Sequence, residues 1–146
     1  MASLFFNVAK KGLMDGSIDL DTDDIRVALV MLNTTTDTQP EVTTVSGFTT
    51  LDECDATGYA RQAIGGKAVT QDNANNRGVF NGNQVVFSGL SGNATRNIQG
   101  ALIYKHVGAD SSNIPICFSE FTTPVPKEAT SITVPWHANG ILYLGG

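Results

Sequence analysis

One stretch of the sequence decides the fold class: Ile25-Arg26-Val27-Ala28-Leu29-Val30-Met31. Its residues are β-branched or apolar at nearly every position, which is typical of a strand that is buried on both faces. The uninterrupted apolar run, Val27 to Leu32, is far shorter than the roughly 18–20 residues that a bilayer requires. We therefore expect a buried strand inside a β-sheet and no membrane-spanning segment.

Downstream of this strand, short apolar or β-branched segments alternate with Gly, Asn, Asp and Pro. Turn signals that recur about every 8–12 residues are typical of a β-sandwich or a small barrel. No later window has helical periodicity, so we expect an edge strand within Glu41–Leu51 and further strands at Gly58–Ile64, Gly66–Thr70, Gly78–Phe80, Gln84–Ser88, Ile98–His106, Pro115–Phe121, Ser131–Trp136 and Gly140–Leu144.

The N-terminal segment has a different period. Between Ser3 and Asp15 the apolar residues recur at the spacing of one continuous helix face. Ser3 is the expected N-cap of this helix and Gly16 the expected C-cap. The predicted fold is mainly β, an antiparallel β-sandwich or jelly-roll-like barrel, with one N-terminal α-helix at residues 3–15 that covers one end of the sheet.

Length and charge narrow the function classes. The chain has 146 residues, with 9 basic and 14 acidic side chains and a net charge of −5. This length predicts a single domain, residues 1–146, whose core needs no disulfide, metal or cofactor. Nucleic-acid-binding surfaces cluster Lys and Arg, whereas Lys10-Lys11 is the only adjacent basic pair here. We expect no direct nucleic-acid partner.

Candidate catalytic and metal-binding residues are few and scattered. His106 and His137 supply the only imidazoles, the side chain that changes its charge near neutral pH. Cys54 and Cys117 are too far apart for a Cys-x-x-Cys site, so a zinc site would need the fold to gather all four residues. We interpret Cys117 as a small buried hydrophobe, and we expect neither an enzyme nor a bound metal.

The acidic connector that follows the helix raises a calcium-binding alternative. If Asp19 is position one of an EF-hand loop, Asp24 stands at position six, where glycine is needed. Val30 then stands at position twelve, where a bidentate glutamate is needed. We therefore interpret the connector as a turn whose Asp side chains accept hydrogen bonds from nearby backbone N–H groups.

The aromatic residues leave a carbohydrate-binding module open, because flat rings on a sandwich face can stack on sugar rings. Nearly all of them lie within expected strands and have apolar neighbours, which favours packing in the core. The residues concerned are Tyr59, Tyr104, Phe118, Phe121, Trp136 and Tyr143.

A set of packing motifs, taken together with the helix that ends in Asp15-Gly16, points to one group of proteins: Asp24–Val30, Gly58–Gln62, Val69–Asp72, Ala101–Lys105, Pro115–Phe118 and Ile132–Trp136. The chain resembles the small virion structural proteins of tailed bacteriophages, and it is most similar to capsid decoration (cement) proteins. The likeness covers nearly the whole chain, and its motifs include no catalytic signature.

This resemblance implies a non-enzymatic protein that is made in the bacterial host cytoplasm and sits on the capsid surface of the virion. It implies that the chain binds the major capsid protein and stabilises contacts between capsid subunits. It also implies a closed symmetric oligomer, first a homotrimer and second a dimer, whose interfaces bury sheet edges. A tail or baseplate component and a carbohydrate-binding module remain the alternatives.

Two segments are the expected contact elements. The start of the chain is apolar near a terminus, and the loop Asn33–Thr50 is long for a compact domain. The stretch Asn33–Leu51 is also longer than the short loop that members of the family often carry after the first strand. The candidate interface residues are Phe5, Phe6, Asn33, Thr36, Val45 and Phe48.

Overall fold

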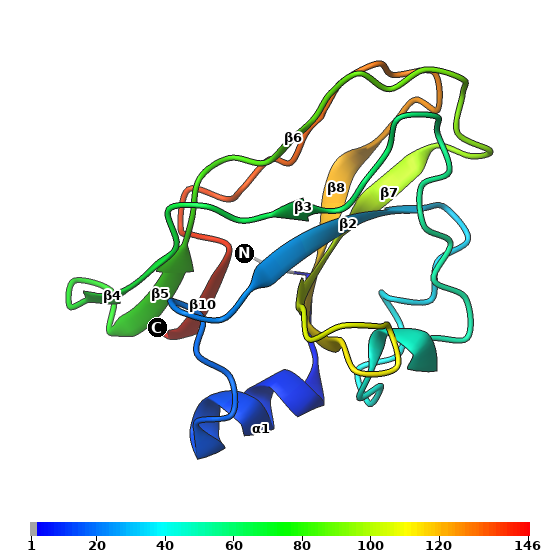
Figure 1. Cartoon of the computed structure of the whole chain (residues 1–146). Coiled ribbons are helices and arrows are strands. Elements are labelled where there is room, and N and C mark those ends of the chain that lie inside the picture. Colours follow the sequence, from blue (N-terminus) through cyan, green and yellow to red (C-terminus); the bar gives the residue numbers. More distant parts are fainter. Residues whose placement is uncertain (1–2) are drawn as a thin grey trace.

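All strand pairs in the computed structural model, which describes residues 3–146, are antiparallel (Figure 1). A five-stranded sheet has the order β1-β8-β7-β2-β3, a three-stranded sheet the order β10-β5-β4, and β6 pairs with β9. The prediction of a mainly β, sandwich-like fold with a helix near the N-terminus is confirmed. The elements are β1 Leu4–Phe5, α1 Asn7–Asp15, β2 Ile25–Met31, η1 Val45–Gly47, β3 Gln62–Ala63, β4 Ala68–Asp72, β5 Arg77–Asn81, β6 Val86–Phe87, β7 Ile98–Lys105, β8 Ile114–Val125, β9 Ile132–Thr133 and β10 Leu142–Gly145.

Strand β2, an inner strand of the large sheet, is buried on both faces, as its sequence predicts. Alternate residues of a strand point to opposite faces of the sheet. Val27 and Leu29 belong to a first core, whereas Ala28 and Val30 belong to a second core on the other face. The nearly continuous apolar composition of β2 is therefore the consequence of two separate packing surfaces.

The first core lies between the five-stranded sheet and the two smaller sheets. Ile103 of β7 and Ile116 of β8 contribute to it from the large sheet, and Phe80, Phe87 and Leu142 contribute from the smaller ones. Both central strands β7 and β8 are long, so they carry the large sheet across the width of the molecule (Figure 1). This core joins all the sheets into one packed unit.

The second core is covered by an irregular loop instead of a sheet. Val45 and Phe48 from this loop pack with Phe6, Tyr104 and Phe118. The rings of Phe6 and Phe48 meet edge to face with centroids 5.4 Å apart. The loop therefore provides the layer that a second sheet would provide in a regular sandwich.

The expected edge strand within Glu41–Leu51 does not form, and this segment contains the 3₁₀ helix η1 instead. The physical reason is that side chains of the loop form hydrogen bonds to backbone groups that a neighbouring strand would otherwise satisfy. Thr35 Oγ1 donates to Gln39 Oε1 at 2.5 Å, and Gln39 Oε1 also accepts from the backbone N–H of Thr49 at 2.9 Å. Threonine and glutamine here satisfy backbone groups locally.

The N-terminal helix is shorter than predicted, because it begins at Asn7 and not at Ser3. Leu4 and Phe5 instead form β1, which pairs with β8 at Phe118 and Cys117. The expected N-cap Ser3 has another role, since its Oγ accepts a hydrogen bond from the backbone N–H of Glu120 at 2.9 Å. Backbone groups along β8 need hydrogen-bond partners, and the segment Leu4–Phe5 supplies them. Helical periodicity is a local pattern, so it does not predict this pairing with a distant strand. The predicted C-cap Gly16 is confirmed, with φ of 78°.

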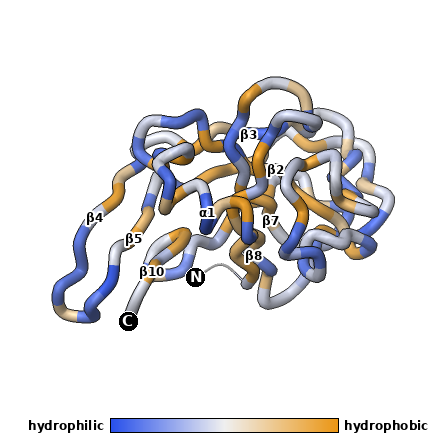
Figure 2. Tube along the Cα trace, turned by 90° about the horizontal axis from the view of Figure 1, so that it is seen from below, coloured by the Kyte–Doolittle hydropathy of each residue, from blue (hydrophilic) through white to orange (hydrophobic). Residues whose placement is uncertain are grey.

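The three-stranded sheet carries a hairpin, β4–β5, that extends away from the rest of the molecule (Figure 1). Figure 2 shows that the tip of this hairpin is hydrophilic, and the C-terminus lies beside it. Within residues 3–146, no helix combines the length and apolarity that crossing a membrane would require. The projecting hairpin leaves most of β4 exposed at the edge of its sheet.

Candidate functional site

A groove of about 390 Å³ lies between the end of α1 and the three-stranded sheet. Its volume falls in the range of binding pockets, roughly 300–1,000 Å³. One wall comes from α1 and the connector that follows it, and the other from β4, β5 and β10. The main apolar residues along these walls are Leu13, Ile18, Leu20, Val69, Phe80, Leu142 and Leu144. We call this surface the hairpin groove.

Strand register explains why this sheet face is apolar. Val69 pairs with Phe80 and Phe80 with Leu142, so these three side chains form one row on one face. Phe80 and Leu142 are only 2% exposed because they contact the first core. Val69, at the edge of the sheet, is 49% exposed. The apolar row therefore begins in the core and ends in the open groove.

The next row of the same face lies farther from the core. Gly78 pairs with Leu144 on one side and with Gln71 on the other. Leu144 is 49% exposed. A Cβ added at Gly78 would meet no heavy atom of the described residues within 4 Å, apart from its chain neighbours. The missing side chain at Gly78 thus keeps this part of the groove open.

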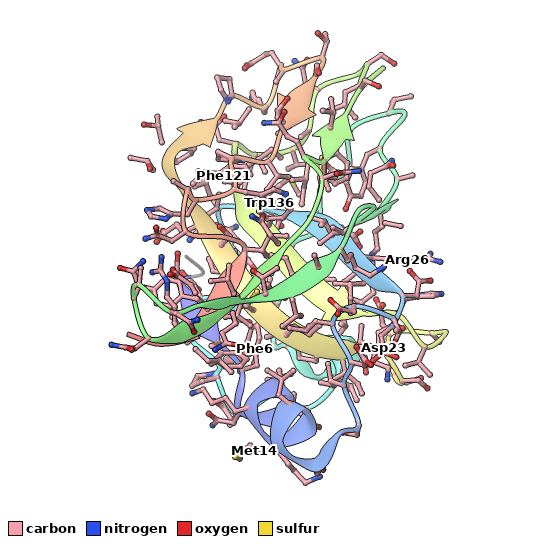
Figure 3. The ribbon with its side chains drawn as sticks, turned by 90° about the vertical axis from the view of Figure 1, so that its left-hand side faces the viewer. Phe6, Met14, Asp23, Arg26, Phe121 and Trp136 are labelled. Carbon is pink, nitrogen blue, oxygen red and sulfur yellow. The ribbon has the colours of Figure 1, made fainter. Side chains whose placement is uncertain are left out.

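The connector gives the groove an acidic rim, formed by Asp19 and Asp21. Other carboxylates of this segment have cationic partners: Asp15 with Lys11 at 2.7 Å, Asp23 with Lys105 at 2.8 Å, and Asp24 with Arg26 at 2.8 Å. Figure 3 shows Asp23 and Arg26 on the same side of the molecule. Within the described chain, neither Asp19 nor Asp21 has a cation at salt-bridge distance.

The interpretation of the connector as a hydrogen-bonded turn is confirmed. Asp19 Oδ1 accepts from the backbone N–H of Asp21 at 3.1 Å, and Asp23 Oδ2 accepts from the backbone N–H of Asp19 at 2.8 Å. Among residues 3–146, no group of three or more His, Cys, Asp or Glu side chains is arranged to hold a metal ion.

Beside the groove, the outer edge of β4 is exposed to solvent. All but one of the residues from Ala68 to Asp72 are exposed, and Asp72 is half-buried. Among the described residues, β5 is the only strand that pairs with β4. An edge strand presents unpaired N–H and C=O groups that can bind another extended chain.

Most of the interface residues expected from the sequence lie inside the molecule. Phe6, Thr36, Val45 and Phe48 are buried, so the expectation that they form an exposed contact surface is corrected. The reason is that the start of the chain and the loop together cover the second face of the large sheet. Phe5 is half-buried, beneath the Lys10 ammonium at 5.6 Å from its ring centroid.

The remaining candidate, Asn33, is exposed at the surface. Its backbone N–H donates to Asp52 Oδ2 at 2.8 Å, which fixes the start of the loop. The loop also exposes other residues along its length, among them Thr38, Thr43 and Ser46. The prediction that Asn33 and Phe5 contact a partner stays a prediction.

A polar cluster elsewhere joins two loops. Arg61 donates to Glu53 Oε1 at 2.7 Å and to Asp110 Oδ1 at 2.6 Å, and its guanidinium lies over the ring of Tyr104 at 5.1 Å. These hydrogen bonds raise the pKa of Arg61 and hold the pKa of Asp110 below its ordinary value. Tyr59 donates to Glu53 and accepts from Leu29 N–H. Each charged group has a partner, so the cluster serves to fasten loops together.

The two cysteines are buried, and the two histidines form hydrogen bonds with other parts of the fold. Burial raises the pKa of Cys54, and it raises the pKa of Cys117 to about 12. The interpretation of Cys117 as a buried hydrophobe is confirmed, since it is fully buried in the first core. The backbone N–H of His106 donates to Asp24 O at 2.8 Å, and His137 Nδ1 accepts from Asn139 N–H at 3.1 Å.

The aromatic residues mostly pack in the interior, as predicted. Tyr104, Phe118 and Phe121 are buried. Trp136 is half-buried against the first core, and its indole N–H donates to the carbonyl of Asn83 at 3.1 Å. Tyr143 is half-buried, with the Arg77 guanidinium 4.7 Å from its ring centroid.

Sequence reasoning missed the groove residues. The alternation of Leu142 and Leu144 in the last strand predicts a common face for these two side chains, but it does not show that the core ends between them. Comparison of the chain with protein-family models, with curated proteins and with solved structures finds no match.

Proposed function

We propose that this chain is a non-enzymatic structural protein of a tailed-bacteriophage virion, which binds the outer capsid shell and stabilises contacts between major capsid protein subunits. The proposal starts from the resemblance of its packing motifs to those of capsid decoration proteins. Its place of action is then the capsid surface, after synthesis in the host cytoplasm. The protein acts through contact area and shape, not through a reactive group.

The observation that carries the proposal is the hairpin groove together with the outer edge of β4. Apolar side chains exposed beside an open strand edge favour contact with another chain. Val69 and Leu144 are both half exposed to solvent on this surface. A protein whose task is to hold subunits together needs such a surface, and a rigid β-sheet presents it without a cost for ordering.

Charge and symmetry fit the same role. The net charge of −5 disfavours binding to packaged DNA, because like charges repel. We propose a homotrimer as the first assembly and a dimer as the second, since closed symmetry covers strand edges that otherwise promote aggregation. A tail or baseplate location is the alternative for the same contact surface, and a carbohydrate-binding module is the second alternative.

The direct test is binding to purified shells that lack this protein. We expect the protein to co-sediment with mature shells and to raise their melting temperature, because a ligand that binds only the folded assembly stabilises it. The oligomeric state is measured in parallel by light scattering on a sizing column. Immunogold labelling of intact particles locates the protein on the virion.

Tail tubes from the same phage provide the matched comparison. Co-sedimentation with tubes and not with shells supports the tail alternative and overturns the capsid proposal. Binding to a glycan array, lost in Trp136→Ala with the fold retained, supports the carbohydrate-binding alternative. Absence of the protein from purified particles contradicts every virion role.

A further inference from the structure

We infer that the hairpin groove binds an extended segment of the shell protein that carries large apolar side chains and lysine or arginine. This inference rests on the proposed function, because it takes the shell protein as the source of the segment. It goes further by defining the chemistry of the segment and the place where it binds.

The groove surface requires apolar side chains from its occupant. The exposed parts of Val69 and Leu144 face the half-buried Leu13 across the groove. Apolar side chains that fill the space above Gly78 remove this surface from water, which favours binding. Met14, which is 84% exposed, lies on the side of α1 away from the sheets (Figure 3) and so takes no part.

The rim requires positive charge from the same occupant. Asp19 and Asp21, which line the groove, are the acidic residues of this connector that have no cation at salt-bridge distance among the described residues. The neighbouring Asp15, Asp23 and Asp24 are each neutralised by a cation of this chain. A lysine or arginine of the occupant complements the rim, whereas an acidic segment is repelled.

The neighbouring strand favours an extended conformation. Val69, which lines the groove, belongs to β4, the strand at the edge of its sheet. An extended segment can form backbone hydrogen bonds along this edge while its alternate side chains point to the groove side. The segment therefore gains backbone pairing, apolar burial and charge pairing at one place.

A peptide titration tests this chemistry. The probe is a fluorescein-labelled peptide of eight residues that alternates leucine with lysine, and the readout is anisotropy at an ionic strength of roughly 0.15 M. We expect binding by the wild-type chain, and at least about tenfold weaker binding when glutamate replaces the lysines or serine replaces the leucines. Lack of binding by the leucine–lysine peptide up to about 1 mM overturns the inference.

Variants locate the binding. Gly78→Leu fills the groove, and we expect it to weaken binding of the leucine–lysine peptide at least about tenfold. Val107→Ala, at an exposed side chain that does not line the groove, is the control and keeps affinity within about twofold of the wild-type value. If Gly78→Leu does not fold, Leu144→Gln replaces it, because Leu144 already faces solvent. Unchanged affinity in the folded groove variant overturns the inference.

Two further variants test whether the acidic rim of the groove attracts the lysines of the peptide. Asp21→Asn removes one carboxylate from the rim, and Glu128→Gln removes one from a loop that lines a different pocket. We expect about a three- to tenfold loss of peptide affinity for Asp21→Asn, and a change within about twofold for Glu128→Gln. Equal losses in both variants mean that net charge alone attracts the peptide, which overturns the inference.

Shell binding separates this inference from the proposed function. If wild-type protein binds shells and Gly78→Leu binds them equally well, the groove inference is wrong while the proposed function stands. If wild-type protein fails to bind shells but the peptide results hold, the proposed function is wrong while the groove chemistry remains. The assignment of the segment to the shell protein fails with the proposed function.

Discussion

The strands of the large sheet and those of the three-stranded sheet differ in how far they are buried. In β2 all residues except Arg26 are buried, because each face of the large sheet has its own core. In β4 all residues except Asp72 are exposed, because the hairpin extends past the core that covers its base. The comparison indicates that the large sheet supplies most of the folding stability, while the outer part of the small sheet is free for contact with a partner.

The largest expected effect concerns the loop face of the large sheet. Phe48→Ala removes a buried ring that packs on Phe6, so we expect unfolding stability to fall by about 3–5 kcal/mol in urea titrations. Val107→Ala, at a side chain that is largely exposed, is the control and changes stability by less than about 0.5 kcal/mol. A small effect of Phe48→Ala means that the loop is not part of the core.

The other face of the large sheet is tested at Leu29, which is fully buried in the first core. Leu29→Ala loses the transfer free energy of the side chain and leaves a cavity, so we expect a loss of about 2–5 kcal/mol. Val69→Ala in the hairpin is the matched truncation in the small sheet, and we expect less than about 1 kcal/mol because Val69 is half exposed. Equal losses contradict the contrast between the sheets.

Replacing one glycine by alanine in each sheet tests the same difference in packing between the two sheets. A Cβ at Gly100 in β7 lies 2.5 Å from Ser119 O and 2.7 Å from the ring of Phe118, so Gly100→Ala overpacks the core and loses about 1–3 kcal/mol. Gly78→Ala in β5 enters open space, and we expect a gain of about 0.5–1 kcal/mol because glycine weakens a strand interior. Thermal and urea unfolding of both variants measure this difference. A loss at both positions contradicts it.

The smallest expected effect is a dependence of folding stability on acidic pH, which comes from the ion pair between Arg61 and Asp110. Hydrogen bonds from Arg61 lower the pKa of Asp110, so the unfolded chain takes up this proton more readily than the folded chain. The resulting stability is present above the ordinary Asp pKa of about 3.9 and is lost as pH falls through the lowered pKa. Because the Asp110 side chain is 35% exposed, solvent screening limits the contribution to about 1 kcal/mol.

Urea titrations from neutral to acidic pH measure this contribution. Asp110→Asn is expected to lower stability at neutral pH and to flatten its fall in acid. Val107→Ala, which changes an exposed side chain and no ionisable group, is the control and leaves the acid dependence close to that of the wild-type chain. An Asp110→Asn profile parallel to the wild-type profile contradicts the role of the ion pair.

Local patterns predicted the regular elements well where one interaction dominates. The apolar composition of Ile25–Met31 predicted a strand buried on both faces, and Gly16 predicted the end of the helix, where the backbone takes a positive φ. Predictions were wrong where a distant segment supplied the partner. Leu4 and Phe5 have helical spacing, yet backbone pairing with β8 places them in a strand.

The candidate site shows the same limit. The long loop with Val45 and Phe48 suggested an exposed contact element, because its length and threonine content are typical of a surface loop. The second face of the large sheet needs a cover, and this need depends on residues such as Leu102 and Phe118 that are far away in the sequence. The groove is equally non-local, since Leu13 and Leu144 lie at opposite ends of the chain.

The sequence by itself determined the mainly β class, the buried central strand, the acidic charge and the turn in the connector, because each depends on residues close together along the chain. Only the tertiary structure decided which face a loop covers, where the core ends and which carboxylates lack a cation among the described residues. The physical reason is that burial and charge pairing are set by neighbours in space, and those neighbours come from segments that the chain brings together only on folding.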